Sequence, residues 1–191
     1  MRYVGIDPAT KTGLVVLNSS GELLKAAELL GEGSTSVRRI RMLANEVFQK
    51  IKNGDVVCIE GFALAARDTN KVASGNGWAA RMAVDRHELH YIEVGTSQLK
   101  KFVNVSQWSG QKGSKQRLSN KAVKQLVIES VFQHWGFSTK SDNIADAFVL
   151  AKIAEAVHKV NNGLSLIDFY PRYQLEVIQS ILHPEKKKKR A

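Results

Sequence analysis

The stretch Arg2-Tyr-Val-Gly-Ile-Asp-Pro-Ala-Thr-Lys-Thr-Gly13 decides the fold of this chain. Its apolar residues 3–6 predict a strand that carries the carboxylate of Asp7 at its carboxyl end. Pro8 ends that strand, because proline has no N–H to donate within a sheet. The chain then turns, and residues 12–18 predict a second strand. A carboxylate held where a strand meets a turn has the rigid support that a metal ligand needs. The alternative is a turn aspartate that caps its own backbone.

Three short strands with tight connections open the chain and predict an antiparallel meander. They cover residues 2–7, 12–18 and 22–28. A helical stripe from Ile40 to Ile51 follows, and then the short apolar run 56–60, which is typical of a buried parallel strand. A helix between two strands makes a crossover, so strand 56–60 should lie parallel to the first strand. Glu60 then ends its strand at the same sheet edge as Asp7.

The rest of the chain predicts further helices and one more strand, without internal repeats. We expect helices over 78–89, 97–103, 120–135 and 141–161 and after Pro171, and a strand over 90–94. Residues 61–75 and 104–117 have the polar, glycine-rich composition of irregular segments. The sequence therefore predicts one α/β domain over residues 1–163, with a C-terminal helix and basic tail over 164–191.

Composition excludes several classes of protein. With 191 residues, 43% of them apolar, the chain can bury a sizeable core. Cys58 is the single cysteine, which excludes a disulfide framework or a cysteine-based zinc site and fits a reducing compartment. We expect neither a signal peptide nor a membrane-spanning segment, because no apolar run has the required length or flanks.

The positive charge is concentrated in two places. The formal net charge is +10, yet the chain is close to neutral without seven basic residues between Val94 and Ile128, a segment that has no acid, and five more at 186–190. The seven are Lys100, Lys101, Lys112, Lys115, Arg117, Lys121 and Lys124. Such clustering favours a nucleic-acid partner. The alternative is a solvated loop and a frayed tail.

Two more carboxylates complete a candidate metal site. Asp142 and Asp146 are four residues apart, so both project from one face of the predicted helix. Asp146 has apolar neighbours at 145, 147 and 148, where a charge is costly unless it is paired or binds a cation. The alternatives are that Asp142 only caps the helix and that Glu60 only faces solvent.

Four carboxylates at one sheet edge suit hard cations such as Mg²⁺ or Mn²⁺. Two such ions close together are a common means of phosphodiester hydrolysis. The five histidines have no zinc-site spacing, and there is no glycine-rich phosphate loop. The sequence therefore favours a metal-dependent enzyme that acts on nucleic acid.

Three motifs resemble the RuvC family of Holliday-junction resolvases. They are Val4-Gly-Ile-Asp-Pro8 with Thr12-Gly13, Cys58-Ile-Glu-Gly-Phe62, and Ala145-Asp-Ala147. The resemblance implies an α/β, RNase H-like fold with a five-stranded mixed sheet, in which strands 1–3 are antiparallel and strands 4–5 parallel, with helices on both faces. The small size and long basic loop are most similar to the phage-borne branch, whose members act in the bacterial host cytoplasm.

The resemblance also implies a function. A homodimer would bind four-way junctions and other branched DNA and nick paired strands, leaving 5′-phosphate and 3′-hydroxyl ends. Each site would use two Mg²⁺ ions, with Mn²⁺ as a substitute. Asp7 would bridge the two ions, Glu60 would hold one, and Asp142 with Asp146 the other. Many relatives have the helix acids three apart, where Asn143 stands here, so Asp142 would substitute.

The family pattern implies roles for the basic residues as well. Lys121 stands where relatives have a lysine near the scissile phosphate, and Lys100, or else Lys101, matches a second. Phe62 would stack on an unpaired base at the junction centre, with a core role as the alternative. Residues 75–81 resemble the start of the helix that pairs two subunits. The remaining expected DNA contacts are Lys112, Lys115, Arg117 and Lys124.

Three other readings remain open at this point. The first is another RNase H-like nuclease that acts on flaps, forks or RNA. The second is an actin-type or sugar-kinase-type ATPase, although such a protein needs a second, similar domain and another glycine-rich loop. The third is a DNA-binding module without activity, which would not need four converging acids.

Overall fold

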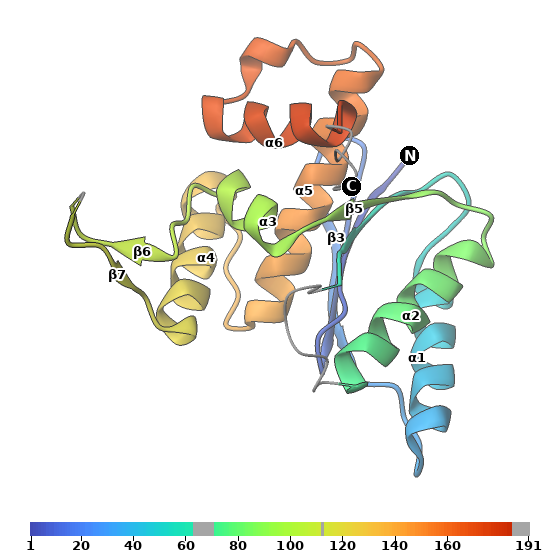
Figure 1. Ribbon diagram of the computed structural model, residues 1–191. Coiled ribbons are helices and arrows are strands. Elements are labelled where there is room, and N and C mark those ends of the chain that lie inside the picture. Colours follow the sequence, from blue (N-terminus) through green and yellow to red (C-terminus); the bar gives the residue numbers. More distant parts are fainter. Residues whose placement is uncertain (63–70, 112, 185–191) are drawn as a thin grey trace, which may run out of the picture.

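The computed structural model describes residues 1–62, 71–111 and 113–184. A five-stranded mixed sheet forms its centre, in the order β3-β2-β1-β4-β5 (Figure 1). The strands are β1 (Tyr3–Asp7), β2 (Thr12–Leu17), β3 (Leu23–Leu29), β4 (Val56–Glu60) and β5 (Tyr91–Val94). Strand β2 is antiparallel to both of its neighbours, β1 and β3, and β4 and β5 run parallel to β1. The predicted α/β, RNase H-like sheet is confirmed.

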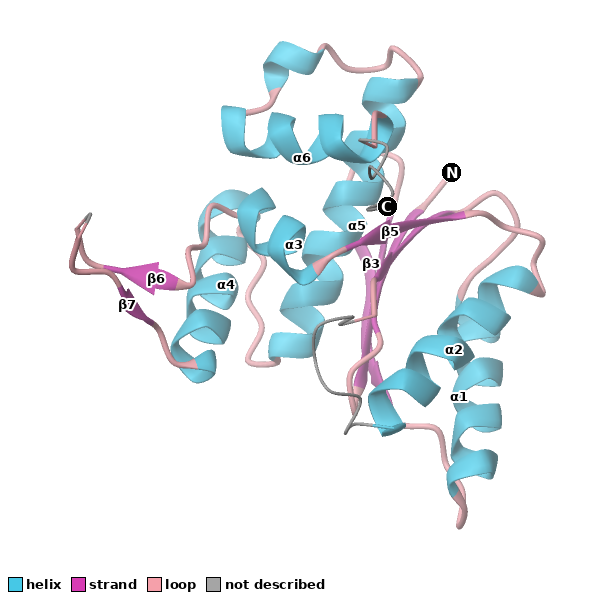
Figure 2. Cartoon of the chain, viewed as in Figure 1, coloured by secondary structure: helices cyan, strands magenta, loops and turns pink. Residues whose placement is uncertain are grey.

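Helices cover both faces of this sheet (Figure 2). They are α1 (Ser36–Lys50), α2 (Lys71–Asp85), α3 (Thr96–Phe102), α4 (Asn120–Trp135), α5 (Asp142–Asn161) and α6 (Arg172–Leu182). A short 3₁₀ helix spans Ile167–Phe169, and a two-stranded hairpin, β6 (Trp108–Ser109) with β7 (Gln116–Arg117), projects from the α3–α4 connection. None of the helices that the structure describes is long and apolar enough to span a bilayer.

The alternation of side chains along β1 separates two cores. Val4 and Ile6 face α1 and α2, in a cluster with residues such as Leu43 and Ala83. Tyr3, on the opposite face, belongs to the core built around α5. Side chains two residues apart share a face of a strand, so Gly5 and Asp7 face α5 as Tyr3 does.

Two glycines allow α5 to lie very close to the sheet. A Cβ atom at Gly5 would lie 1.9 Å from the Ala147 carbonyl oxygen, and one at Gly13 would lie 2.1 Å from the Asn143 carbonyl oxygen. Both contacts are with helix backbone, which cannot move aside cheaply. Glycine at these two positions therefore places the first turns of α5 beside the end of β1.

The start of α2 differs from the prediction. The helix begins at Lys71 rather than at residue 78 and ends at Asp85 rather than at 89. Gly75 and Gly77 lower helix propensity, which is why the sequence pattern favoured a loop here. The tertiary structure compensates, since the buried Asn76 side chain donates a hydrogen bond of 2.7 Å to the Ala9 carbonyl.

The cap of α5 and the basic loop also differ from the sequence analysis. Ser141, not Asp142, is the N-cap of α5, and its hydroxyl accepts from the Ile144 N–H. The N-cap of α3 is Gly95. The segment expected to be irregular between 104 and 117 contains the β6–β7 hairpin. In these segments, residue type alone did not determine which groups form the local hydrogen bonds.

The C-terminal helix predicted after Pro171 is present as α6. Its residues Val177 and Ile178 are buried in the core around α5. Gln174 is also buried, and its amide donates to the Phe102 carbonyl at 3.1 Å. Helix α6 therefore packs on α3 and α5.

Candidate active site

Asp7 and Glu60 lie side by side at one edge of the sheet. Ile6 and Ile59 are partners in the parallel register of β1 and β4, so the residues that follow them end their strands together. Asp7 is buried, with 6% of its surface exposed, and Glu60 is partly buried. The Thr96 hydroxyl, in the first turn of α3, donates a hydrogen bond to Glu60 Oε1 and fixes the orientation of that carboxylate.

The environment of Asp7 opposes its ionisation. Burial, followed by the negative charges of Glu60 and Asp146 and a hydrogen bond with Glu60, raises its pKa well above the usual value for aspartate. A hydrogen bond between two carboxyl groups requires a proton on one of them. The end of β1 therefore concentrates more negative charge than it can hold without protons or a cation.

Asp146 contributes to the same concentration of charge from α5. Desolvation, and then the charge of Glu60, raises its pKa to about 7, while the positive charge of Lys100 acts in the opposite direction. Its side chain is partly buried, and its neighbours in the sequence, Ala145 and Ala147, are buried. The structure thus brings three of the predicted carboxylates, those of Asp7, Glu60 and Asp146, within electrostatic reach of one another.

Asp142 stands at the rim of this group and has a partner. Lys124 on α4 donates a hydrogen bond to Asp142 Oδ2 and forms an ion pair with it. Partial desolvation acts to raise the pKa of the Asp142 carboxyl, but the hydrogen bond and charge of Lys124, together with backbone hydrogen bonds, lower that pKa below its usual value. The same hydrogen bond raises the pKa of Lys124. Asp142 is therefore a stable anion, whereas Asp7 and Asp146 retain protons more readily.

The chemistry of this donor set fits hard divalent cations. All four groups are carboxylates, and a cation would relieve the repulsion that raises the pKa of Asp7 and Asp146. Within residues 1–62, 71–111 and 113–184, no three acidic, histidine or cysteine side chains form a ready-made ligand set for a metal ion. Of the four carboxylates, that of Asp142 forms an ion pair with Lys124.

The predicted basic residues divide into three groups. Lys100 and Lys124 act on the carboxylates, as the charges around Asp146 and Asp142 show. Lys101 instead forms an ion pair of 2.6 Å with Glu176 on α6. Exposed positions on the hairpin and at the start of α4 are occupied by Lys115, Arg117 and Lys121. Lys112 and the tail 186–190 lie outside the described residues.

Phe62 is engaged within the protein. The guanidinium of Arg81 lies 4.1 Å from its ring centroid, and the Trp78 ring is 5.4 Å away. Arg81 is buried, donates to Glu93 Oε2 at 2.7 Å and reaches the Glu60 carbonyl at 3.4 Å. Arg81 therefore links the end of β4 to β5, and Phe62 is only partly accessible.

Two residues near the site were not found from the sequence. Glu28 pairs with Gly13, which in turn pairs with Asp7, so all three share one row across the sheet. Glu28 accepts a hydrogen bond from the Ser141 hydroxyl and is 3.4 Å from the Asn143 amide nitrogen. Thr96 contacts Glu60 directly. The strand register would have indicated Glu28, but a hydroxyl contact such as that of Thr96 has no sequence signal.

The sheet order and the crossover helices define an α/β protein with an RNase H-like fold. Among solved structures, the chain is similar to Thermus thermophilus RuvC, with a TM-score of 0.60 and 17% identity over 85% of this chain and 97% of that one. It is also similar to T. thermophilus RuvC in complex with a Holliday junction substrate, with a TM-score of 0.59 and 18% identity over 85% and 96% of the two chains. No family model and no curated protein matches the sequence. At this level of identity the likeness shows a shared fold.

Proposed function

We propose that this protein is a metal-dependent, structure-selective endonuclease. It would resolve four-way junctions and other branched DNA by paired nicks that leave 5′-phosphate and 3′-hydroxyl ends. The observation that carries the proposal is the buried Asp7, with Glu60 and Asp146 around it, at a sheet edge of an RuvC-like fold. A sheet edge with no functional role would not bring together carboxylates that raise one another's pKa.

Four residues would hold the ions. Asp7, Glu60, Asp142 and Asp146 would bind two Mg²⁺ ions, or Mn²⁺ in their place. When bound, the ions supply a deprotonated water and stabilise the negative charge of phosphodiester cleavage. Thr96 would keep Glu60 oriented through its hydroxyl. Asp142 would exchange its contact with Lys124 for the cation.

Cationic side chains beside the acids would hold the DNA backbone. Lys100, whose charge acts on Asp146, and Lys124, which pairs with Asp142, would contact a phosphate at the site, and Lys121 lies one turn before Lys124 on α4. A lysine ammonium at this position can stabilise charge on the phosphoryl group. Lys101, Lys115 and Arg117 would contact phosphates farther along the arms, with Lys112 as a further candidate. The protein would act as a homodimer of the phage-borne type, one site for each nicked strand.

Parallel cleavage of several synthetic substrates tests this proposal. Four-way, three-way, forked and linear DNA, together with an RNA–DNA hybrid, are incubated with the protein in Mg²⁺ and in Mn²⁺. Symmetric nicks on the four-way junction, ligatable without end repair, are the expected result. Preference for the hybrid or for simple flaps would assign the site to a different RNase H-like activity. ATP hydrolysis without DNA cleavage would contradict the proposal.

A further inference from the structure

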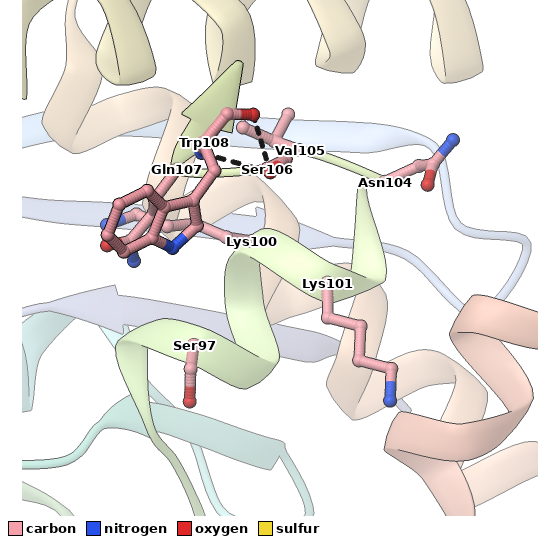
Figure 3. A pocket seen from close by; sticks show the side chains of 8 residues that line it. All are labelled: Ser97, Lys100, Lys101, Asn104, Val105, Ser106, Gln107 and Trp108. Atoms are coloured by element: carbon pink, nitrogen blue, oxygen red, sulfur yellow. Dashed lines mark hydrogen bonds between the residues drawn. The ribbon is translucent and has the colours of Figure 1, made fainter. Parts of the chain in front are cut away.

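A cavity of about 430 Å³ lies between α3 and the β6–β7 hairpin (Figure 3). Its lining is polar and cationic apart from two residues, Val105 and Trp108. The lining residues are Ser97, Lys100, Lys101, Asn104, Val105, Ser106, Gln107 and Trp108. Small-molecule sites of this size can hold a group as large as one nucleotide.

Trp108 is presented to solvent on a fixed backbone. Its side chain is 53% exposed, and it has no ring or cation–π partner in the part of the chain that the structure describes. The Ser106 hydroxyl accepts from the Trp108 N–H at 3.0 Å and donates to its carbonyl at 2.9 Å (Figure 3). Pairing with Arg117 fixes the residue from the other strand. An indole held in this way is a preformed stacking surface.

The charge of the cavity comes mainly from Lys100. The ammonium of Lys101 forms an ion pair with Glu176, and in Figure 3 its side chain points away from the Trp108 indole. Lys100 lines the cavity and also acts electrostatically on Asp146. One cation therefore connects the cavity with the acid cluster, in a segment from Val94 to Ile128 that contains no acid.

We propose that this cavity binds one unpaired nucleotide of the DNA substrate, with its base stacked on Trp108 and its phosphate on Lys100. Asn104 and Gln107 supply amide groups that can hydrogen-bond to base edges. Stacking on an aromatic side chain suits any base, as a structure-selective enzyme requires. This inference rests on the proposed function, because it places the nucleotide next to the strand at the acid cluster. Phe62, for which the family resemblance implied stacking with a core role as the alternative, has the Arg81 guanidinium 4.1 Å from its ring centroid.

The test uses 2-aminopurine at an unpaired position of a branched DNA, and a fully paired duplex of equal length as the reference ligand. Binding and fluorescence are measured in EDTA for the full chain and for Trp108→Ala, Trp108→Leu and Trp108→Phe. Phe169→Ala is the matched control, because that ring is 80% exposed and lies outside the cavity. Trp108→Leu keeps apolar bulk on the hairpin and removes only the ring.

Loss of the ring should weaken binding of the unpaired substrate by about tenfold or more and abolish the quenching of 2-aminopurine. Duplex binding should be unchanged, and Trp108→Phe and Phe169→Ala should behave like the unmodified protein. Equal binding and quenching by Trp108→Leu, or equal loss on duplex and branched DNA, would overturn the inference. Nicking in Mg²⁺ is measured separately. If nicking is normal and the Trp108 variants bind like the unmodified protein, only the inference of a nucleotide site is contradicted. If binding depends on Trp108 but the protein makes no nicks, only the proposed nuclease function is contradicted.

Discussion

The Lys124 ammonium and the Asp142 carboxylate form an ion pair that joins α4 to α5 at the rim of the acid cluster. Both side chains are partly solvent-exposed, at 57% and 32%. Such a pair contributes little to the stability of the fold. Its consequence is local, because Lys124 already supplies Asp142 with the positive charge that a bound cation would otherwise supply.

Replacing Lys124 by alanine should release Asp142 for cation binding. We expect Lys124→Ala to bind Mn²⁺ about two- to fivefold more tightly, since an exposed ion pair of this kind is worth roughly 0.2–1 kcal/mol. Binding to branched DNA should weaken at the same time. Calorimetric titration with Mn²⁺, without DNA, measures the first effect. Weaker Mn²⁺ binding by the variant would show that Lys124 does not compete with the ion.

The two acids of α5 should not be equivalent. Asp146→Asn should abolish nicking, because its partly buried carboxylate stands beside Glu60. Asp142→Asn should leave partial activity, since Asp142 lies at the rim and Ser141 caps the helix without its help. Nicking rates at saturating DNA compare the two variants. An active Asp146→Asn enzyme, or a folded but inactive Asp142→Asn enzyme, would reverse this assignment.

The pKa of Asp146 predicts a pH dependence of stability in the metal-free protein. Folding raises this pKa from 3.8 to about 7, so the unfolded chain releases the proton first. The Asp146 contribution therefore lowers the free energy of unfolding as pH rises from about 4 to about 7. Asp146→Asn should remove this contribution and raise the melting temperature at pH 7.5 by roughly a few degrees. Thermal melts in EDTA at several pH values test it; a variant less stable than the unmodified protein at pH 7.5 would contradict it.

Close contact between β1 and α5 predicts a strong effect at Gly5. Gly5→Ala should destabilise the protein by about 1–3 kcal/mol or more and reduce nicking, because a Cβ there would meet the helix backbone. Gly95→Ala is the matched control. Its φ is −73°, and the atom nearest to a Cβ there would be a side-chain oxygen of Gln98 at 3.6 Å. Urea denaturation of both variants checks this expectation. Equal stability of the two would mean that α5 does not require the glycine.

The sequence predicted the parts of the fold that depend on hydrophobic patterning. The strands ending at Asp7 and Glu60 were predictable because their apolar runs are short and bounded by turn residues. The crossover rule then placed both carboxylates at one sheet edge. The Asp142–Asp146 spacing similarly placed both side chains on one face of α5.

Features set by tertiary packing were not predictable in this way. Helix α2 begins earlier than its composition suggests, since Asn76 bonds to the Ala9 carbonyl. The lysine of α4 that contacts an acid is Lys124, one turn beyond Lys121, the residue that the family pattern favoured. The neighbour relation of Glu28 to Asp7 depends on strand register, which single-residue propensities do not determine.

The most direct test of the central claim compares Asp7→Asn with Asp168→Asn, a matched change at an exposed position of the 3₁₀ helix. Nicking of a four-way junction in Mg²⁺ and binding of the same junction in EDTA are measured for both variants and for the unmodified protein. The account predicts that Asp7→Asn binds the junction normally and makes no nicks, while Asp168→Asn retains both properties. Nicking by Asp7→Asn, or loss of binding together with cleavage, would contradict the assignment of Asp7 as the central carboxylate of a nuclease site.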